Sequence, residues 1–455
     1  MRAIALVALA GCVSLAPSYE RPAAPIPGDL PGGEGTATAA DVPWHEFVRE
    51  PKLQQIIEQA LANNRDLRKA VIAIESARAQ YGIQRAQLFP SIDADVNVTS
   101  SRIPLGTPDN ATIHSTTYSA TVGTVAWEID LFGRIKSLSN AKQESYLGTI
   151  ENARAARIAL IAEIATAYVT IAADRSRLQI ANDTMASSKR TMDLTEQLVG
   201  GGTSNRGDYW QAATVFQQAR ADVAALTASI AQDRNALELL AGSPVAEALL
   251  PAALPEHLDW FADVPVGLSS QALLARPDVQ SAEHDLKAAN ANIGAARAQF
   301  FPSLSLTANG GIASAALGAL FTSPAAIFTI APTLAMPLFR GGANRANLDF
   351  TIAQKKLFVA SYELAIQTAF REVADALATR ATIKEQLAAQ ADLVNASTKG
   401  LELARARYEG GVEPFLTTLV SERALYAAKS SLVATQVLTL GSRVTLYRVL
   451  GGGLK

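Results

Sequence analysis

Apolar and polar residues alternate after two prolines, Pro90 and Pro302, as expected of strands that have one apolar face. After the first proline, the apolar positions are Ile92, Ala94, Val96 and Val98, and the polar positions between them are Asp93, Asp95, Asn97 and Thr99. After the second proline, the apolar Leu304, Leu306 and Ala308 alternate with Ser305, Thr307 and Asn309. Each proline also ends an Ala-rich segment with helical spacing, because proline cannot continue a helix.

A second alternating segment follows each of these strands and predicts a returning partner. Over 118–129 the parity of the apolar positions changes near Gly123, which predicts a β-bulge. Over 328–336 the apolar positions share a face, although Pro332 is unfavourable in a paired strand. The sequence therefore predicts four amphipathic strands, two in each half of the chain.

Most of the remaining chain has an apolar residue at every seventh position, which predicts long helices that coil around their neighbours. The two longest helices are predicted over 134–200 and 341–409, and each would be about 100 Å long at 1.5 Å per residue. One position in each apolar stripe is charged, Arg157 in the first and Arg380 in the second. Glycines end both helices, and shorter helices are predicted before the strands and after the glycines, over 62–88, 205–241, 277–300 and 414–448.

The two halves of the chain repeat each other. Residues 66–98 match residues 278–310 at an offset of 212, ending in Phe89-Pro90-Ser91 and Phe301-Pro302-Ser303. So long a repeat indicates a duplicated half-domain, and we expect the loop-rich segments before and between the halves to meet at the middle of the helical part. The predicted divisions are a signal peptide (1–11), an N-terminal tether and equatorial segment (12–61), a first repeat (62–241), a second equatorial segment (242–276), a second repeat (277–448) and a tail (449–455).

The 42 residues from Ala298 to Phe339 carry no charge, which by hydropathy alone would suggest a transmembrane helix. Prolines and glycines divide this stretch into pieces too short to span a membrane as helix, whereas strands of about ten residues suffice for a membrane barrel. Aromatic residues gather where helix and strand meet, as in an interfacial belt. The predicted membrane-interface aromatics are Phe89, Trp127, Phe132, Phe301 and Phe339.

The amino-acid composition indicates that some apolar residues face an apolar environment outside the protein core. The chain has 455 residues, of which 49% are hydrophobic and only 18% charged, against about 25% charged in ordinary soluble proteins. Its formal net charge of −2 gives no electrostatic basis for binding nucleic acid. The four histidines lie far apart, and His284 with its acidic neighbours is interpreted as a solvated helix face. With no nucleophile-elbow motif or phosphate-binding loop, we predict no enzyme activity, no cofactor and no metal site.

The single cysteine ends a short signal-like segment. Arg2 precedes an uninterrupted apolar run, Ala3 to Ala10, and the sequence Leu9-Ala10-Gly11-Cys12 is similar to a bacterial lipobox. Cys12 is therefore predicted to be the lipidated first residue of the mature protein. The alternative is a buried N-terminal cysteine of no consequence.

Four amphipathic strands leave two edges unpaired, and each unsatisfied backbone group in hydrocarbon costs several kcal/mol. The sheet must therefore close by sharing strands among copies, with Asp93 and Asp95 on the inner, pore-lining face. A membrane barrel continued by long coiled helices predicts a conduit across a membrane and a periplasm. A passive porin would not carry such helices, and a periplasmic coiled-coil scaffold without channel activity would not need the strands or the aromatic belt.

Several motifs carry a resemblance to a known family. They are Arg276-Pro277-Asp278-Val279, the run from Ile293 to Ser303, Leu338-Phe339-Arg340-Gly341-Gly342 and the ending from Leu446 to Gly453. Together they resemble the outer-membrane efflux factors of the TolC superfamily, and Pro17-Ser18-Tyr19-Glu20-Arg21-Pro22 resembles the start of its OprM/NodT lipoprotein branch. The resemblance implies a mainly α chain with a small β part, in which a homotrimer forms an α-barrel continued by a twelve-stranded transmembrane β-barrel.

The same resemblance implies a lipid-anchored exit duct in the outer membrane that extends into the periplasm. It would dock to a periplasmic adaptor (membrane fusion) protein and an inner-membrane pump of the resistance-nodulation-division type, and would export drugs or other small compounds. The outer-membrane component of a type I protein secretion system is the alternative that shares this conduit. The sequence does not name the exported compound.

Family members close the periplasmic tip by contacts between coils beyond the glycine turns. Matched residue by residue, the implied periplasmic gate consists of Asp208, Tyr408, Leu416 and Arg423. Thr417 and Val420 stand where the family often has aspartate, so this sequence departs from the acidic ring found there.

Overall fold

The structure is a computed structural model that describes residues 14–30, 42–104, 112–202, 204–264, 266, 269–322 and 325–452. The predicted signal peptide (1–11) and Cys12 lie outside the described residues.

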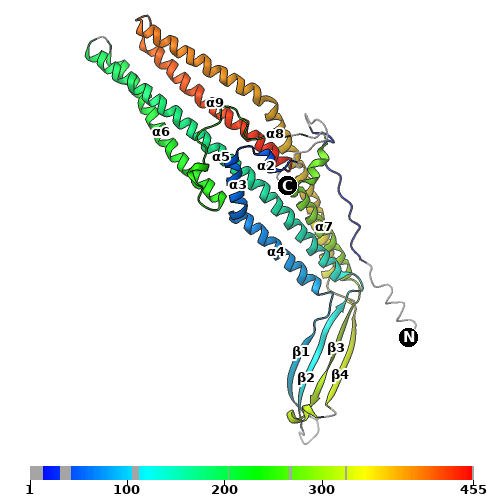
Figure 1. The fold of residues 1–455 in the computed structure, drawn as a ribbon. Coiled ribbons are helices and arrows are strands. Elements are labelled where there is room, and N and C mark those ends of the chain that lie inside the picture. Colours follow the sequence, from blue (N-terminus) through cyan, green and yellow to red (C-terminus); the bar gives the residue numbers. More distant parts are fainter. Residues whose placement is uncertain are drawn as a thin grey trace. The chain divides into compact units, whose positions relative to one another are not determined.

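Helices predominate, and Figure 1 shows them together with one small sheet. The α-helices are α2 (Trp44–Phe47), α3 (Pro51–Asn63), α4 (Arg65–Ala86), α5 (Arg134–Gly200), α6 (Arg206–Ala241), α7 (Pro277–Ala298), α8 (Ala343–Glu409) and α9 (Phe415–Val449). The strands are β1 (Asp93–Pro104), β2 (Thr112–Ile129), β3 (Ser303–Ser314) and β4 (Ala326–Ala335), and short 3₁₀ helices are η2 (Glu247–Leu249), η3 (Ser270–Ala275) and η4 (Leu317–Phe321). The predicted fold class, mainly α with four strands per chain, is confirmed.

The chain forms two compact units. The sheet unit comprises Met1–Ala23, Ala73–Ile150 and Ser281–Glu363, and the coil unit comprises Ala24–Ile72, Glu151–Gln280 and Leu364–Lys455. Both long helices, α5 and α8, have 67 residues and continue from one unit into the other.

The sheet is an antiparallel meander in the order β1-β2-β3-β4. The predicted bulge is present, because the register between β2 and β3 shifts between Thr124 and Trp127, and Ala126 has a positive φ of 53°. Pro332 pairs with Leu306 within β4, which is an edge strand of the sheet. Within the sheet of a single chain, β4 is paired on one side only, and such an edge position tolerates proline.

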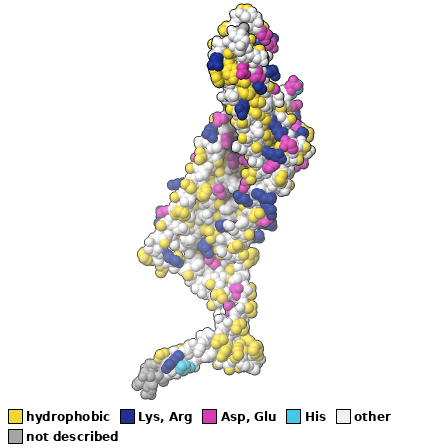
Figure 2. Space-filling view, turned by 90° about the vertical axis from the view of Figure 1, so that its left-hand side faces the viewer, with side chains coloured by type: hydrophobic (Ala, Val, Ile, Leu, Met, Phe, Trp, Pro, Cys, Tyr) yellow, Lys and Arg dark blue, Asp and Glu magenta, His cyan; other side chains and the backbone are white. Residues whose placement is uncertain are grey.

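The strand register gives the sheet one apolar and one polar face. Val96 pairs with Ala120, which pairs with Ile312, and the same face continues through Phe328 and Ile330 of β4. Because paired residues share a face, the bulge restores Trp127 and Ile129 to this apolar side. Val96 is 81% exposed and Phe328 is 82% exposed, so the apolar face has no cover in the isolated chain. In Figure 2, hydrophobic side chains gather on the lower part of the sheet, while charged ones are scattered over the helices.

In the coil unit, the two equatorial segments pack on each other. Val48 forms a bridge with Phe261, and the Phe47 ring stacks on Phe261 at 5.3 Å and on Tyr447 at 4.0 Å. The first of these segments is more ordered than the sequence suggested, because α3 begins within the predicted N-terminal tether and equatorial segment (12–61) and continues to Asn63. Its start is set by Pro51 at the first helical position and by the Glu50 side chain, which accepts a hydrogen bond from the Lys52 amide.

Two further predictions need correction. The helix predicted over 62–88 is interrupted at Asn64, whose side-chain amide donates to the Leu240 carbonyl at 2.8 Å while its oxygen accepts the Leu67 amide. The interpretation of His284 and its acidic neighbours as a solvated face holds only for Asp285, which is exposed, because Glu283 is buried and His284 Nδ1 lies 2.7 Å from a Glu144 carboxylate oxygen.

One helix among the described residues, α5, contains an 18-residue window apolar enough to cross a membrane, with a mean hydropathy of 1.5. In that window 56% is buried within the protein, so more than half of it packs against other parts of the same chain.

Candidate functional site

The polar face of the sheet carries the two predicted pore-lining residues. Asp93 pairs with Gly123 and Asp95 pairs with Thr121, so both carboxylates lie on the face opposite Val96. Glu128 lies on the same polar face but is held by Arg134, with 2.6 Å between Arg134 Nη2 and a Glu128 oxygen. Among the described residues, Asp93 and Asp95 form no ion pair. The polar face of the sheet therefore presents the carboxylates of Asp93 and Asp95 to its surroundings.

The five predicted interface aromatics all lie within a few residues of a boundary between helix and strand. The structure brings two of them together, because the rings of Phe132 and Phe301 stack with centroids 4.8 Å apart. Phe89 and Phe339 are exposed, and Trp127 is half-buried on the apolar face. An aromatic ring at such a boundary can lie between an apolar phase and water.

The end of the coil unit is closed by packing among four helices. Ala212 and Val215 of α6 form a buried cluster with Phe415 and Leu419 of α9. Met192 of α5 and Tyr408 of α8 are partly buried and pack against this cluster. Figure 1 places the α5–α6 and α8–α9 turns at the same end of the coil unit. The two helical hairpins are thus joined here by a core of their own.

Asp208 and Tyr408, two of the predicted gate residues, lie beside this cluster. Asp208 is in the first turn of α6, where its carboxylate accepts from Ser204 Oγ at 2.9 Å and its amide is capped by Asn205. The Tyr408 ring lies 5.4 Å from the Phe415 ring. Burial, and then the charge of Asp208, raise the pKa of the Tyr408 hydroxyl. The hydroxyl is therefore protonated at neutral pH and available as a donor.

The other two predicted gate residues differ in their surroundings. Arg423 Nη2 donates to Thr214 Oγ1 at 2.9 Å and so links α9 to α6. Leu416 is 52% exposed, and Val420 one turn later is exposed on the same side of α9. The structure therefore buries Phe415 in the cluster and leaves the adjacent Leu416 available to another surface.

One polar group near this cluster was missed by the sequence analysis. The Glu422 carboxylate is buried, and its Oε1 accepts from Ser187 Oγ at 3.1 Å and from Arg405 Nη2 at 3.3 Å. Arg405 also donates to Ser187 Oγ at 2.9 Å, so one carboxylate ties α9 to both α5 and α8. Its spacing could have indicated that Glu422 is buried. Glu422 follows Phe415 by seven residues and Leu419 by three, so all three residues lie on one face of the helix.

The break in the second apolar stripe also has a structural cause. Arg380 Nη1 donates to the Val264 carbonyl at 2.9 Å, which fastens α8 to the second equatorial segment. An arginine can serve there because its long stem packs along apolar surface while its head reaches a polar partner.

Among the described residues, the sheet has an exposed apolar face and two edges without a partner strand, and it is continuous in sequence with long coiled helices. These features are those of a subunit of a membrane-spanning channel. A sequence profile described as outer membrane efflux protein matches residues 56–243 and 268–452. The chain is 45% identical to the solvent efflux pump outer membrane protein SrpC of Pseudomonas putida, over 99% of this chain and 97% of that protein. It is 39% identical to the outer membrane protein OprJ of Pseudomonas aeruginosa, over 98% and 95%.

Solved structures agree with the sequence relatives. The open-state outer membrane channel MtrE of Neisseria gonorrhoeae superposes with a TM-score of 0.84 at 36% identity, over 97% of this chain and 99% of that one. A crystal structure of a Pseudomonas aeruginosa membrane protein gives a TM-score of 0.89 at 39% identity, over 97% and 98%. The chain belongs to the outer membrane efflux protein family. Its predicted function as an outer-membrane efflux channel is confirmed at that level.

Proposed function

We propose that three copies of this chain form the exit duct of a tripartite efflux system, which carries drugs or other small compounds across the outer membrane. The duct has no catalytic role. It works with a periplasmic adaptor protein and an inner-membrane pump of the resistance-nodulation-division type. A lipid on Cys12 anchors each copy to the membrane.

The observation that carries this proposal is the amphipathic sheet. On its apolar face Val96 of β1, Val122 of β2 and Phe328 of β4 are exposed, and β1 and β4 each pair on one side only within the described chain. Lipid can cover the apolar face, but only strands from further copies can satisfy the edges in hydrocarbon. Three copies of four strands would close a barrel of twelve.

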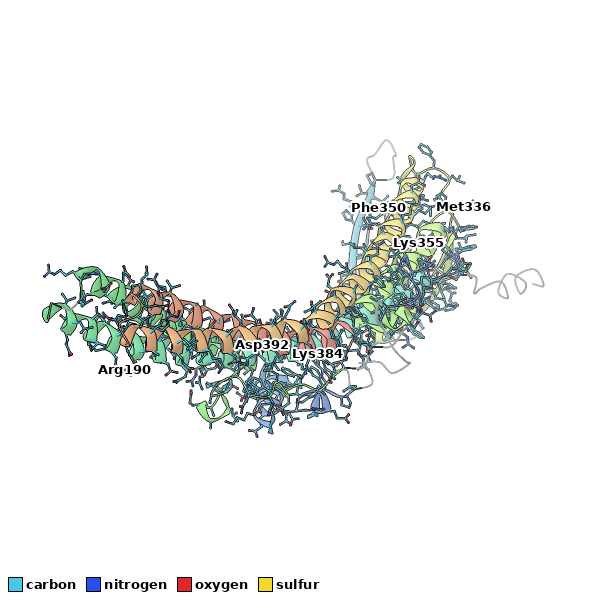
Figure 3. The ribbon with its side chains drawn as sticks, turned by 90° about the horizontal axis from the view of Figure 1, so that it is seen from above. Arg190, Met336, Phe350, Lys355, Lys384 and Asp392 are labelled. Atoms are coloured by element: carbon cyan, nitrogen blue, oxygen red, sulfur yellow. The ribbon has the colours of Figure 1, made fainter. Side chains whose placement is uncertain are left out.

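The helices support the same assembly. No residue of α4 is buried in the isolated chain. Along α8, Phe350, Leu357 and Leu364 are exposed at intervals of seven residues. Figure 3 shows Phe350 in the N-terminal part of α8, with side chains standing out along the helix. A seven-residue apolar stripe on a long helix is what a neighbouring coil would cover.

In this assembly the polar face of the sheet lines the duct. Asp93 and Asp95 from each copy would make the lumen acidic and favour cations. The aromatics at the ends of the strands would lie at the membrane interface, as girdles do in outer-membrane barrels.

The helical end forms the gate. Leu416, exposed beside the buried Phe415, would pack against its counterparts in the other copies. Asp208, Tyr408 and Arg423 would hold the two helical hairpins of each copy together during closure, since Arg423 already joins α9 to α6.

An export assay tests the proposed function. In a strain that lacks its own exit duct, the chain expressed with its adaptor and pump should restore expulsion of a fluorescent apolar dye. The Phe328→Asp variant, whose apolar face is interrupted, should not. Restored secretion of a protein substrate without dye expulsion would favour the type I secretion alternative and contradict the proposal.

The gate is tested separately with the isolated channel. Asp208→Ala should raise its single-channel conductance or open probability, whereas Glu196→Ala, an exposed carboxylate near the end of α5, should leave both unchanged. If Asp208→Ala leaves the conductance unchanged, the gate assignment is wrong.

A further inference from the structure

A recess of about 540 Å³ lies among three helices of the coil unit, α5, α6 and α9, and we call it the α5 recess. Its apolar lining includes Leu239, Leu240 and Val444 together with alanines of α5 and α6. Leu239 is 79% exposed, so the chain itself leaves this apolar surface open. A concave, mostly apolar site of about 300–1,000 Å³ is of the size at which proteins bind small molecules.

The α5 recess faces away from the equatorial segments. One arginine on each of the three helices donates a hydrogen bond to the second equatorial segment, and these are Arg175 of α5, Arg234 of α6 and Arg443 of α9. The recess residue Thr166 lies nine residues before the first of these arginines, and Ala236 and Thr445 each lie two residues after the other two. At about 3.6 residues per turn, separations of nine and of two residues both reach the opposite side of a helix. The equatorial segments and the recess therefore lie on opposite faces of these helices.

In the proposed trimer, the α5 recess opens into the duct. Copies that join side by side would arrange their long helices as the wall of a tube, with one helical face inside and one outside. The equatorial segments have to lie outside, because inside they would fill the duct. The opposite face, which carries the recess, then lines the passage through which exported compounds move.

Asp233 of α6 gives the recess an acceptor that the chain itself does not use. Its Oδ2 is buried and receives no hydrogen bond from the described residues. Burial raises the pKa of Asp233, and the Asp174 carboxylate, which lies within hydrogen-bonding reach, raises it further. Asp174 has a cationic partner in Arg177 at 2.7 Å, whereas Asp233 forms no ion pair with the described residues. A positive charge in the recess would stabilise the ionised form of Asp233.

Two exposed residues of opposite charge also line the recess. Glu163 of α5 and Arg448 of α9 form no ion pair with the part of the chain that the structure describes. Their charges offset each other, so the charge of ionised Asp233 remains. An apolar lining with one uncompensated carboxylate fits a small molecule that has an apolar body and a single positive charge.

We propose that the α5 recess binds small lipophilic amines, whose ammonium group lies at Asp233 and whose apolar body packs against Leu239 and Val444. The inference rests on the proposed function, because it concerns compounds on their way through the duct. Three copies would place three such sites at one level of the passage. Binding has to be weak enough for release, as in any conduit that its cargo must leave again.

The first experiment compares three probes that share one apolar body and differ in charge, namely naphthylmethylamine, naphthylmethanol and naphthoate. Equilibrium dialysis against the purified trimer in nanodiscs measures their binding, with the binding to empty nanodiscs subtracted. The amine should bind at least tenfold more tightly than the alcohol, and the anion should bind no better than the alcohol. A tighter anion, or equal affinities for the amine and the alcohol, would overturn the proposal.

Charge variants assign the binding to the recess. Asp233→Asn should weaken binding of the amine at least tenfold and leave binding of the alcohol unchanged, because only the amine uses the charge. Asp392→Asn, which alters an exposed carboxylate of α8 outside the recess, should bind both probes as the wild type does. Unchanged amine binding in Asp233→Asn, or an equal loss in Asp392→Asn, would show that the amine is held elsewhere.

A filling variant keeps the test valid if Asp233→Asn disturbs the helices. Ala236→Trp leaves Asp233 in place and occupies the recess, so the amine and the alcohol should both lose binding while the mass of the trimer is kept. If Ala236→Trp instead breaks the trimer, the recess belongs to a contact between copies and the proposal is wrong.

The export assay and bilayer recordings separate this inference from the proposed function. A trimer that conducts and restores dye expulsion, but binds the amine no better than empty nanodiscs do, contradicts the binding site alone. A protein that neither assembles nor conducts contradicts the proposed function as well.

Discussion

The sheet and the end of the coil unit that carries the α5–α6 and α8–α9 turns use apolar side chains in opposite ways. Val96 and Phe328 stand almost fully exposed on the sheet, whereas Phe415 and Leu419 are buried in a cluster formed by the chain's own helices. The sheet therefore depends on lipid and on further copies, while the helical end has a core before any assembly. The exposed Leu416 is the exception at that end, and it is there that we place the gate.

The largest expected effect distinguishes two adjacent residues. Phe415→Ala should lower the free energy of unfolding by about 3–5 kcal/mol, because it opens a cavity in the cluster. Leu416→Ala should cost less than about 1 kcal/mol, since little burial is lost, but should raise channel conductance. Guanidinium titrations followed by circular dichroism, together with bilayer recordings, measure both. Equal stability losses would show that the cluster is not a core of its own.

The next effect compares the two faces of the sheet. Val96→Arg should destabilise the barrel in vesicles by about 2–4 kcal/mol, as expected of a charged residue facing lipid. Asn97→Arg, one residue further on the polar face, should have a much smaller effect because its charge enters water. Urea unfolding from lipid vesicles provides the measurement. If the Asn97 variant were the less stable one, the assignment of the faces would be reversed.

A smaller effect is expected at the buried carboxylate of the coil unit. Glu422→Gln should cost about 1–3 kcal/mol, because Arg405 and Ser187 lose a charged acceptor. Glu402→Gln, an exposed carboxylate on α8, should stay within about 0.5 kcal/mol of the wild type. Denaturant titration of both variants tests this, and an unchanged Glu422 variant would mean that the three residues contribute nothing to joining the helices.

The smallest effect concerns selectivity rather than stability. Replacing Asp93 and Asp95 together by asparagine should move the cation-to-anion permeability ratio toward one and leave the unfolding curve unchanged. Asp193→Asn combined with Glu196→Gln, both on α5, serves as the control of equal charge change. Reversal potentials in a salt gradient give the ratio, and an anion preference in the wild type would contradict an acidic lumen.

The periodic parts of this fold could be predicted from the sequence. A period of two predicted the strands and the change of parity predicted the bulge, because one face of every strand meets a different environment from the other. The seven-residue stripes predicted α5 and α8 to within two residues of their ends. The edge position of Pro332 required the strand order, which no local pattern contains.

Residues whose partners are distant in the sequence could not be placed in this way. Glu283 lies in an acidic, surface-like stretch, yet it is buried because Arg21, 262 residues away, covers it. Arg380 interrupts the apolar stripe of α8, because its guanidinium donates a hydrogen bond to the Val264 carbonyl in another segment of the chain. Asp208 and Tyr408 were matched by family resemblance, and the structure places them close enough for the charge of Asp208 to act on Tyr408. Their role in closing the gate stays a prediction.

The central claim is that copies of this chain close one sheet into a conducting barrel. The most direct test measures the oligomeric mass of the purified protein together with its conductance in a planar bilayer. We predict the mass of three chains and discrete conductance steps that the Asp208→Ala variant increases. A monomer that does not conduct would contradict the account.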